Sequence, residues 1–413
     1  MNLPLRKWLK VSLFNLMLVA CIGVVLRYKI AYSLPFVDQK FLLEGHSHFA
    51  FAGWVTQALM ALMVGVLSEQ AGGNFFPRYR WMLYANLITA FGMLLSFPAE
   101  GYGAISIVFS MASIFTSYGF AYMFLRDLKR LPNSNSSHPW FKVALLSNVV
   151  SSIGPYTLAY MMASKNIHQN FYLSSVYFFL HFQYNGWFFF ACMGLMMYQI
   201  EKQKTHGDIL KSVYALFALA LIPAYFLSVL WWPIPVWLYI IVLLASLSQI
   251  LGWAAMIMYI RKKGLVMAMS PRKLPRTLFL LSGVALSIKL LLQAGSVIPS
   301  LSTLAFGFRP IVIGYLHLIF LGIITLFLLA YCTNFRLINI NSKSLTGIII
   351  FSAGIFLNEI LLMIQGVSDL SYHGVPFIDQ LLLLAAVFLF SGIATINYGQ
   401  FFSEHDPDHK LVR

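Results

Sequence analysis

The sequence predicts an all-α integral membrane protein with twelve transmembrane helices in three pseudo-symmetric four-helix units. Apolar residues make up 60% of the 413-residue chain and charged residues only 10%. A water-soluble domain of this size could not cover its surface with so few charges. The other two observations are the number of long apolar segments and a short motif that recurs at about one third of the chain length.

The apolar segments are long enough for helices, because a spanning helix needs about 20 apolar residues and a barrel strand about half as many. In lipid, each span must satisfy its own backbone hydrogen bonds. Pro155 and Pro223 are expected to kink the fifth and seventh spans. The expected spans are 11–33, 46–68, 80–98, 104–125, 143–163, 172–198, 209–230, 236–260, 277–298, 311–333, 345–365 and 377–401.

The basic residues predict the orientation. With both termini in the cytoplasm, 22 of the 28 Lys and Arg residues fall in cytoplasmic segments and 5 outside, and Lys289 lies within a span. This bias is typical of cytoplasmic loops and explains the net charge of +15 without nucleic acid as a partner. We therefore expect a multi-pass protein surrounded by membrane lipid, in a bacterial-type inner (plasma) membrane.

The recurring motif is His-x4-Gly-Trp. It occurs at 48–54 and 181–187, and 317–323 keeps the His and the Gly. The histidines are 133 and 136 residues apart, which predicts internal repeats. We expect one transmembrane domain, 1–413, with repeats of approximately 1–130, 131–265 and 266–413.

The three histidines lie early in spans two, six and ten, in one tier about 5–13 Å below the outer surface at about 1.5 Å rise per residue. Neutral imidazole is a common ligand of metals and haem. Trp54, Gly53 and Gly322 could offer an aromatic wall and close backbone approach to a flat macrocycle. His46 and His48 are about 200° apart on a helix, so they would serve different centres or face different surroundings.

Two other interpretations of the histidines stay open. They could form hydrogen bonds between helices, or they could line a proton or ion pathway with Lys289, Asn358 and Glu359, since ionisable residues within a membrane need a reason. Lys289 could pair with Glu359 or take part in such a proton path.

Twelve spans in three units, with histidines early in spans two, six and ten, resemble the catalytic subunit (subunit I) of haem-copper oxidases and the related nitric oxide reductases. The resemblance implies that His48, or His46, and His317 hold haem b. It also implies that His181 is a ligand for a second metal or a distal group over an open coordination position. One or two haems, a quinol or cytochrome electron donor and a small gas ligand are the partners it suggests.

The sequence departs from that family at the copper centre. Span seven has no histidine, His317 stands alone in span ten with Tyr315 two residues earlier, and Asn185 stands where the family has a tyrosine. The copper site is therefore incomplete. We expect a haem-binding protein in redox or diatomic-gas (O2/NO) chemistry or response, short of complete O2 reduction. If it is an enzyme, it is an oxidoreductase.

Two functions of other classes remain. A proton-coupled secondary transporter could use buried Lys289 and Glu359, although that class usually repeats at half the chain length. A cofactor-free, oxidase-like assembly subunit would tolerate replacement of the histidines.

Overall fold

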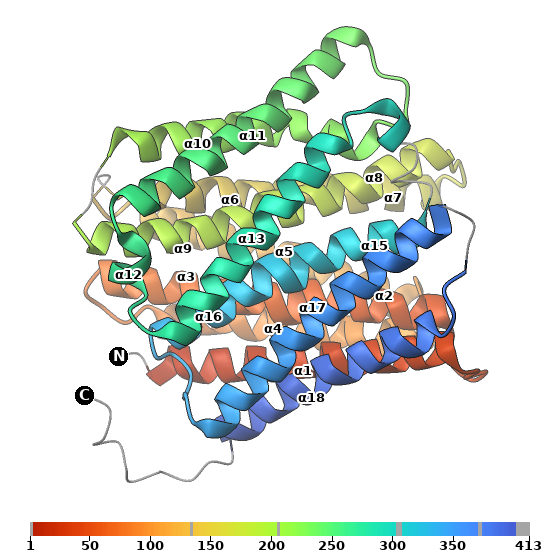
Figure 1. Ribbon diagram of the computed structural model, residues 1–413, viewed down its shortest axis with the longest axis horizontal. Coiled ribbons are helices and arrows are strands. Elements are labelled where there is room, and N and C mark those ends of the chain that lie inside the picture. The colour runs from red at the N-terminus through yellow and green to blue at the C-terminus, as the bar shows by residue number, and fades with distance from the viewer. Residues whose placement is uncertain (1–2, 133–134, 205–206, 303–307, 371–373, 402–413) are drawn as a thin grey trace.

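A computed structural model describes residues 3–132, 135–204, 207–302, 308–370 and 374–401. The last residues of the third expected repeat, 402–413, lie outside this part of the chain. The protein is 85% helical, and no strand occurs in the described ranges. Figure 1 shows most of the long helices running roughly parallel, as in a membrane bundle.

Nine helical segments of the described chain are long and apolar enough to cross a membrane, and the bent pair α10 and η3 adds a tenth. The protein is therefore a multi-pass helical membrane protein. The expected spans 143–163 and 172–198 are also helical but are not among these ten, so the count of twelve stays a prediction. The ten segments are α1 (Leu3–Ala31), α2–η1–α3 (Gln39–Phe49, Ala50–Thr56, Gln57–Gln70), α4 (Phe76–Glu100), α5 (Ala104–Leu128), α10–η3 (Asp208–Leu221, Pro223–Val229), α11 (Val236–Lys262), α13 (Lys273–Gly295), α15–η4–α16 (Arg309–His317, Leu318–Thr325, Leu326–Asn334), α17 (Ser342–Leu370) and α18 (Ile378–Phe401).

Prolines lie beside two interruptions in the helices. α6 (Ser137–Ser151) gives way to α7 (Ile153–Ala163) two residues before Pro155. α10 ends before Pro223, and the following 3-10 helix η3 is bent by 47° from it. Proline lacks an N–H and collides with the preceding turn. The expected kink at Pro223 is confirmed by the bend, and at Pro155 the structure shows an interruption of the helix. The remaining helices are α8 (Gln169–His181), η2 (Phe182–Phe188), α9 (Phe189–Lys202) and the short α12 (Leu265–Met269).

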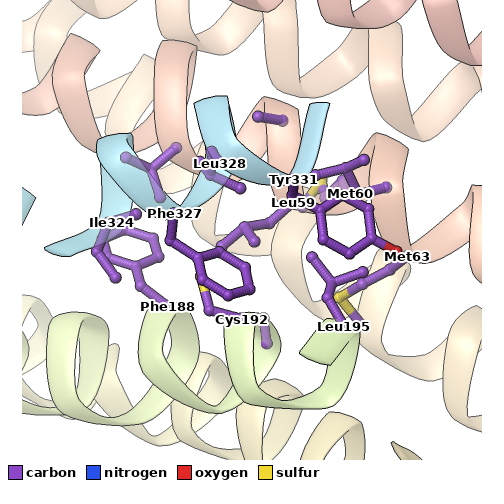
Figure 2. Packing of buried hydrophobic residues seen from close by; sticks show 14 of the residues in the cluster. Leu59, Met60, Met63, Phe188, Cys192, Leu195, Ile324, Phe327, Leu328 and Tyr331 are labelled. Carbon is purple, nitrogen blue, oxygen red and sulfur yellow. The ribbon is translucent and has the colours of Figure 1, made fainter. Parts of the chain in front are cut away.

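The helices that carry the histidine motif lie at the centre of the bundle. The most apolar window of Gln39–Gln70 is 89% buried, against 17% for Ala104–Leu128 at the periphery. The rings of Phe51, Phe188 and Phe320 contact one another, with centroids 4.5 to 5.7 Å apart. Figure 2 shows the adjoining core, in which side chains of α3, α9 and α16 interdigitate.

The two ends of the described chain lie side by side. Lys10 of α1 donates to the backbone carbonyl of Gln400 at the end of α18, at 2.6 Å. α17 packs on α18 through glycine, since a Cβ added at Gly392 would lie 2.5 Å from the backbone nitrogen of Phe351. Contact between small residues is a common way for helices to associate in membranes.

Candidate functional site

Each histidine of the recurring motif stands just before a π-helix. His181 immediately precedes η2, His317 immediately precedes η4, and His48 lies two residues before η1. π-helical turns are rare and are frequent at functional sites. The sequence did not predict these turns, which occur at the same place in all three motif helices.

Polar side chains from neighbouring helices bind carbonyls of the π-helices. Asn15 donates to the carbonyl of Gly53 at 2.6 Å, and Asn86 donates to that of Ala52 at 3.0 Å. Ser282 donates to the carbonyl of Ile323 at 2.9 Å. Because unsatisfied carbonyls are costly in lipid, these donors stabilise the irregular turns.

Two tryptophans of the motif bind threonines on neighbouring motif helices. Trp54 Nε1 donates to Thr325 Oγ1 at 3.0 Å, and Trp187 Nε1 donates to Thr56 Oγ1 at 3.2 Å. In each pair, the Trp follows its motif His by six residues and the Thr follows its own motif His by eight. Matched bonds therefore join the third motif helix to the first and the first to the second.

The second and third motif helices are not joined by a matching Trp–Thr bond. At the corresponding offsets they carry the apolar residues Phe189 and Ile323. Both line a cavity of about 20 Å³, together with Asn185 and Lys289. A cavity of this size holds about one water molecule.

His317 interacts electrostatically with His46, and the charge of Arg27 on α1 acts on both imidazoles. Nδ1 of His317 donates to the carbonyl of Ile313 at 2.8 Å, which leaves Nε2 unprotonated. Nδ1 of His46 is buried without a hydrogen-bond partner. Of the two expected pairs of haem ligands, these interactions favour His46 with His317 over His48 with His317.

His48 points toward α4. Its ring stacks on Phe97 with centroids 4.4 Å apart, and Nε2 lies 3.3 Å from the hydroxyl of Tyr102. Burial, with a contribution from the Glu44 carboxylate, raises the pKa of Tyr102, so this hydroxyl stays protonated. Either Nε2 of His48 or the hydroxyl can be the donor in this contact. As expected from their spacing, His46 and His48 have different surroundings.

His181 uses both ring nitrogens within the protein. Nε2 lies 2.8 Å from the carbonyl of Leu221, which can only accept, so Nε2 carries the proton. Nδ1 then accepts from Asn185 at 3.1 Å, and Lys289 donates to the amide oxygen of Asn185 at 2.7 Å. The kink at Pro223 explains the free carbonyl, because the amide of Tyr225 bonds to Ile222 instead.

The expected pair of Lys289 and Glu359 is not formed, because Lys289 binds Asn185. Glu359 accepts from its neighbour Asn358 at 3.2 Å. Glu359 also lines a lateral cavity of about 580 Å³, bounded by α8, η3, α13, α15, η4 and α17. The structure thus separates the two ionisable side chains into different environments.

The glycines and Trp54 of the motif serve helix packing. A Cβ at Gly53 would lie 2.6 Å from the ring of Phe49, and one at Gly322 would lie 3.2 Å from Ala285. The space that sequence reasoning gave to a flat cofactor is therefore filled by side chains. No cluster of three or more His, Cys, Asp or Glu residues able to hold a metal ion occurs in the described ranges.

Sequence reasoning missed Thr56, Thr325 and Arg27. The threonines had a signal, since each follows its motif His by the same interval. Arg27 was counted only toward topology, yet it lies within electrostatic range of Arg309 and Asp379 as well as the histidines. Comparison with protein-family models and with curated proteins finds no match for this chain.

Proposed function

We propose that this chain is a membrane haem protein built on the twelve-span plan of haem-copper oxidase subunit I, acting in redox or diatomic-gas chemistry. The observation that carries the proposal is the pair of His46 and His317, which come from two motif helices. Nδ1 of His46 is buried without a hydrogen bond, while His46 also bonds the backbone of Val19, and the bond of His317 to Ile313 is made by Nδ1. The matched Trp–Thr bonds support the three-unit plan.

The side chains of this pair and of Arg27 have the chemistry that a haem b needs, although the packing around Gly53 and Gly322 would have to open to admit the macrocycle. His46 and His317 would be the axial ligands, and Arg27 would bind the carboxylates of the macrocycle. The backbone bond of His317 orients the imidazole, as is usual for metal-ligating histidines. A bound haem supplies one-electron redox chemistry and, where a coordination position is open, gas binding. Both ring nitrogens of His181 form hydrogen bonds, with the Leu221 carbonyl and with the amide of Asn185. We therefore do not include His181 among the metal ligands.

The test is an oxidised and a dithionite-reduced absorption spectrum of the detergent-purified protein, with a pyridine haemochrome assay. We expect sharp α and β bands that are lost in His46→Ala and His317→Ala and retained in His48→Ala. The His48 variant is the matched control, since its ring contacts Phe97 instead. Absence of a Soret band after expression with ample haem, or loss of the bands only in His48→Ala, would refute the assignment.

The alternative is a proton-coupled transporter, which is favoured by the chain Lys289–Asn185–His181. Linked donors and acceptors inside a bundle are typical of proton relays. In proteoliposomes, a relay predicts proton-coupled uptake that is lost in Lys289→Met. Uptake that survives this substitution would exclude a role of Lys289 in coupling.

A further inference from the structure

Three arginines lie around the carboxyl end of α16, at the end of the bundle where the N-terminus lies. Arg6 of α1 donates to the backbone carbonyl of Arg336 at 2.6 Å, and Arg272 donates to that of Asn334. Burial, together with the charge of Arg336, lowers the pKa of Arg272. Figure 1 shows α12 and α16 toward the same end of the bundle as the N-terminus. Arg6, Arg272 and Arg336 are called the arginine cluster below.

No carboxylate of the described residues balances the charge of the arginine cluster. The ion pairs in this part of the chain include none of its three members. Other basic residues do have such partners, since Arg78 pairs with Asp127 at 2.8 Å and Lys202 pairs with Glu69. The cluster thus brings three positive charges together without a counter-charge from the structure described.

The guanidinium groups also have hydrogen-bond donors to spare. Each has five N–H groups, and Arg6 and Arg272 each donate one hydrogen bond, to a carbonyl at the end of α16. Nε of Arg6 is buried without a partner, and the exposed side chain of Arg336 makes no hydrogen bond within the described ranges. Cations stabilise the carboxyl end of a helix, but this role uses only two of the donors. The others, with most of the charge, are available to an anion.

The arginine cluster lies where a span meets the membrane surface. Arg272 directly precedes α13, and Arg336 follows the last residue of α16 by two positions. The same segments carry exposed apolar side chains, because Leu3, Met267 and Ile340 are 72%, 59% and 40% exposed. Cations beside exposed apolar residues at the ends of spans match the boundary between lipid headgroups and acyl chains. This position favours a lipid over an anion dissolved in water.

We propose that the arginine cluster binds the phosphate of an anionic phospholipid from the cytoplasmic leaflet. Guanidinium groups bind phosphate through paired, charge-assisted hydrogen bonds. In the predicted orientation this end of the bundle faces the cytoplasm, and basic residues beside spans on that side attract anionic lipids. A phosphate bound here would link the ends of α1, α13 and α16. The inference does not depend on haem binding.

The test is a lipid titration of the full chain in neutral detergent, followed by native mass spectrometry. The two lipids are phosphatidylglycerol and phosphatidylcholine with the same acyl chains. We expect phosphatidylglycerol to bind with a Kd lower by roughly tenfold or more. Arg272→Gln and Arg336→Gln should each raise that Kd by about fivefold, the effect of one basic residue near an anionic lipid surface. Arg336→Lys keeps the charge and should retain most of the affinity.

Arg126→Gln is the matched control. Arg126 is an exposed arginine in the last turn of α5, which packs mainly against α4 and α6. Its removal takes away the same charge outside the arginine cluster, so the Kd for phosphatidylglycerol should stay unchanged. Equal Kd values for the two lipids, or an equal rise in Arg126→Gln and Arg336→Gln, would overturn the proposal.

Inorganic phosphate separates a lipid site from a site for a dissolved anion. Added at millimolar concentration, it should leave the Kd for phosphatidylglycerol unchanged, because the acyl chains hold the lipid phosphate beside the cluster. Displacement of the lipid by inorganic phosphate would refute the assignment to phospholipid. Arg336→Gln is the decisive variant for both arms, since its side chain has no hydrogen bond in the described structure and its loss should leave the melting temperature unchanged.

Discussion

The two Trp–Thr bonds between motif helices can be tested by double-mutant cycles. Trp187 is fully buried and Thr56 is 6% exposed, with 3.2 Å between the indole nitrogen and the hydroxyl. Thr56→Val keeps the shape and removes the acceptor. A buried donor left without a partner costs about 1–3 kcal/mol, while interhelical bonds measured in membranes average about 0.6 and reach about 1.7 kcal/mol.

We therefore expect Thr56→Val to lower the free energy of unfolding by about 1–2 kcal/mol. The coupling energy with Trp187→Phe should be about 1 kcal/mol. The bond from Trp54 to Thr325 is shorter, at 3.0 Å, so its cycle should give at least as large a coupling energy. The assay is equilibrium unfolding in mixed micelles titrated with dodecyl sulfate.

Thr333→Val is the control. Its buried hydroxyl bonds only the carbonyls of Leu329 and Ala330 in its own helix. Because it shares no partner with Trp187, its coupling to Trp187→Phe should vanish within about 0.5 kcal/mol. Coupling energies below that value in both Trp–Thr cycles would refute the idea that these bonds join the motif helices.

Two further experiments test helix packing and the pH dependence of stability. Gly186→Ala places a Cβ 2.4 Å from that of Ser147 and should destabilise the protein by about 1–3 kcal/mol, whereas Gly295→Ala, with open space around it, should be neutral or stabilising in thermal unfolding. His138 lies before the fifth expected span. Burial, together with the charge of Lys142, lowers the pKa of its imidazole to about 4. The unfolded chain then binds more protons below the ordinary pKa of 6.5, so stability is full above pH 6.5 and falls toward pH 4, by about 3 kcal/mol at most. The measurement is the melting temperature between pH 4 and pH 6.5. It should depend less on pH in His138→Gln than in the unchanged protein, and an equal dependence would exclude His138 as the cause.

Composition and hydropathy predicted the class of this protein because they sum over many residues. The helical fold and the breaks beside Pro155 and Pro223 follow from length, apolarity and backbone chemistry. Individual side-chain partners do not. His46 and His48 differ by two positions, and only packing against α1 and α4 decides which of them approaches His317.

The spacing of residues within single helices also did not predict the π-helices or the separation of Lys289 from Glu359. A π-turn depends on donors such as Asn15 and Ser282, which come from other helices. Lys289 and Glu359 both lie within expected spans, but the direction of each side chain is set by its helix face. Both features are tertiary in origin.

The three junctions between the motif helices are not alike. Two of their three junctions are closed by a Trp–Thr bond, and the third has Ile323 and Phe189 at the matching offsets. That junction also holds the small cavity with Asn185 and Lys289. Because an ionisable side chain inside a bundle is costly and needs a reason, Lys289 at the junction without a Trp–Thr bond is the first residue to substitute in tests of function. Asn185 and Lys289 adjoin the third motif helix, which also carries His317. The two proposed functions, haem binding and proton movement, would therefore depend on the same helix.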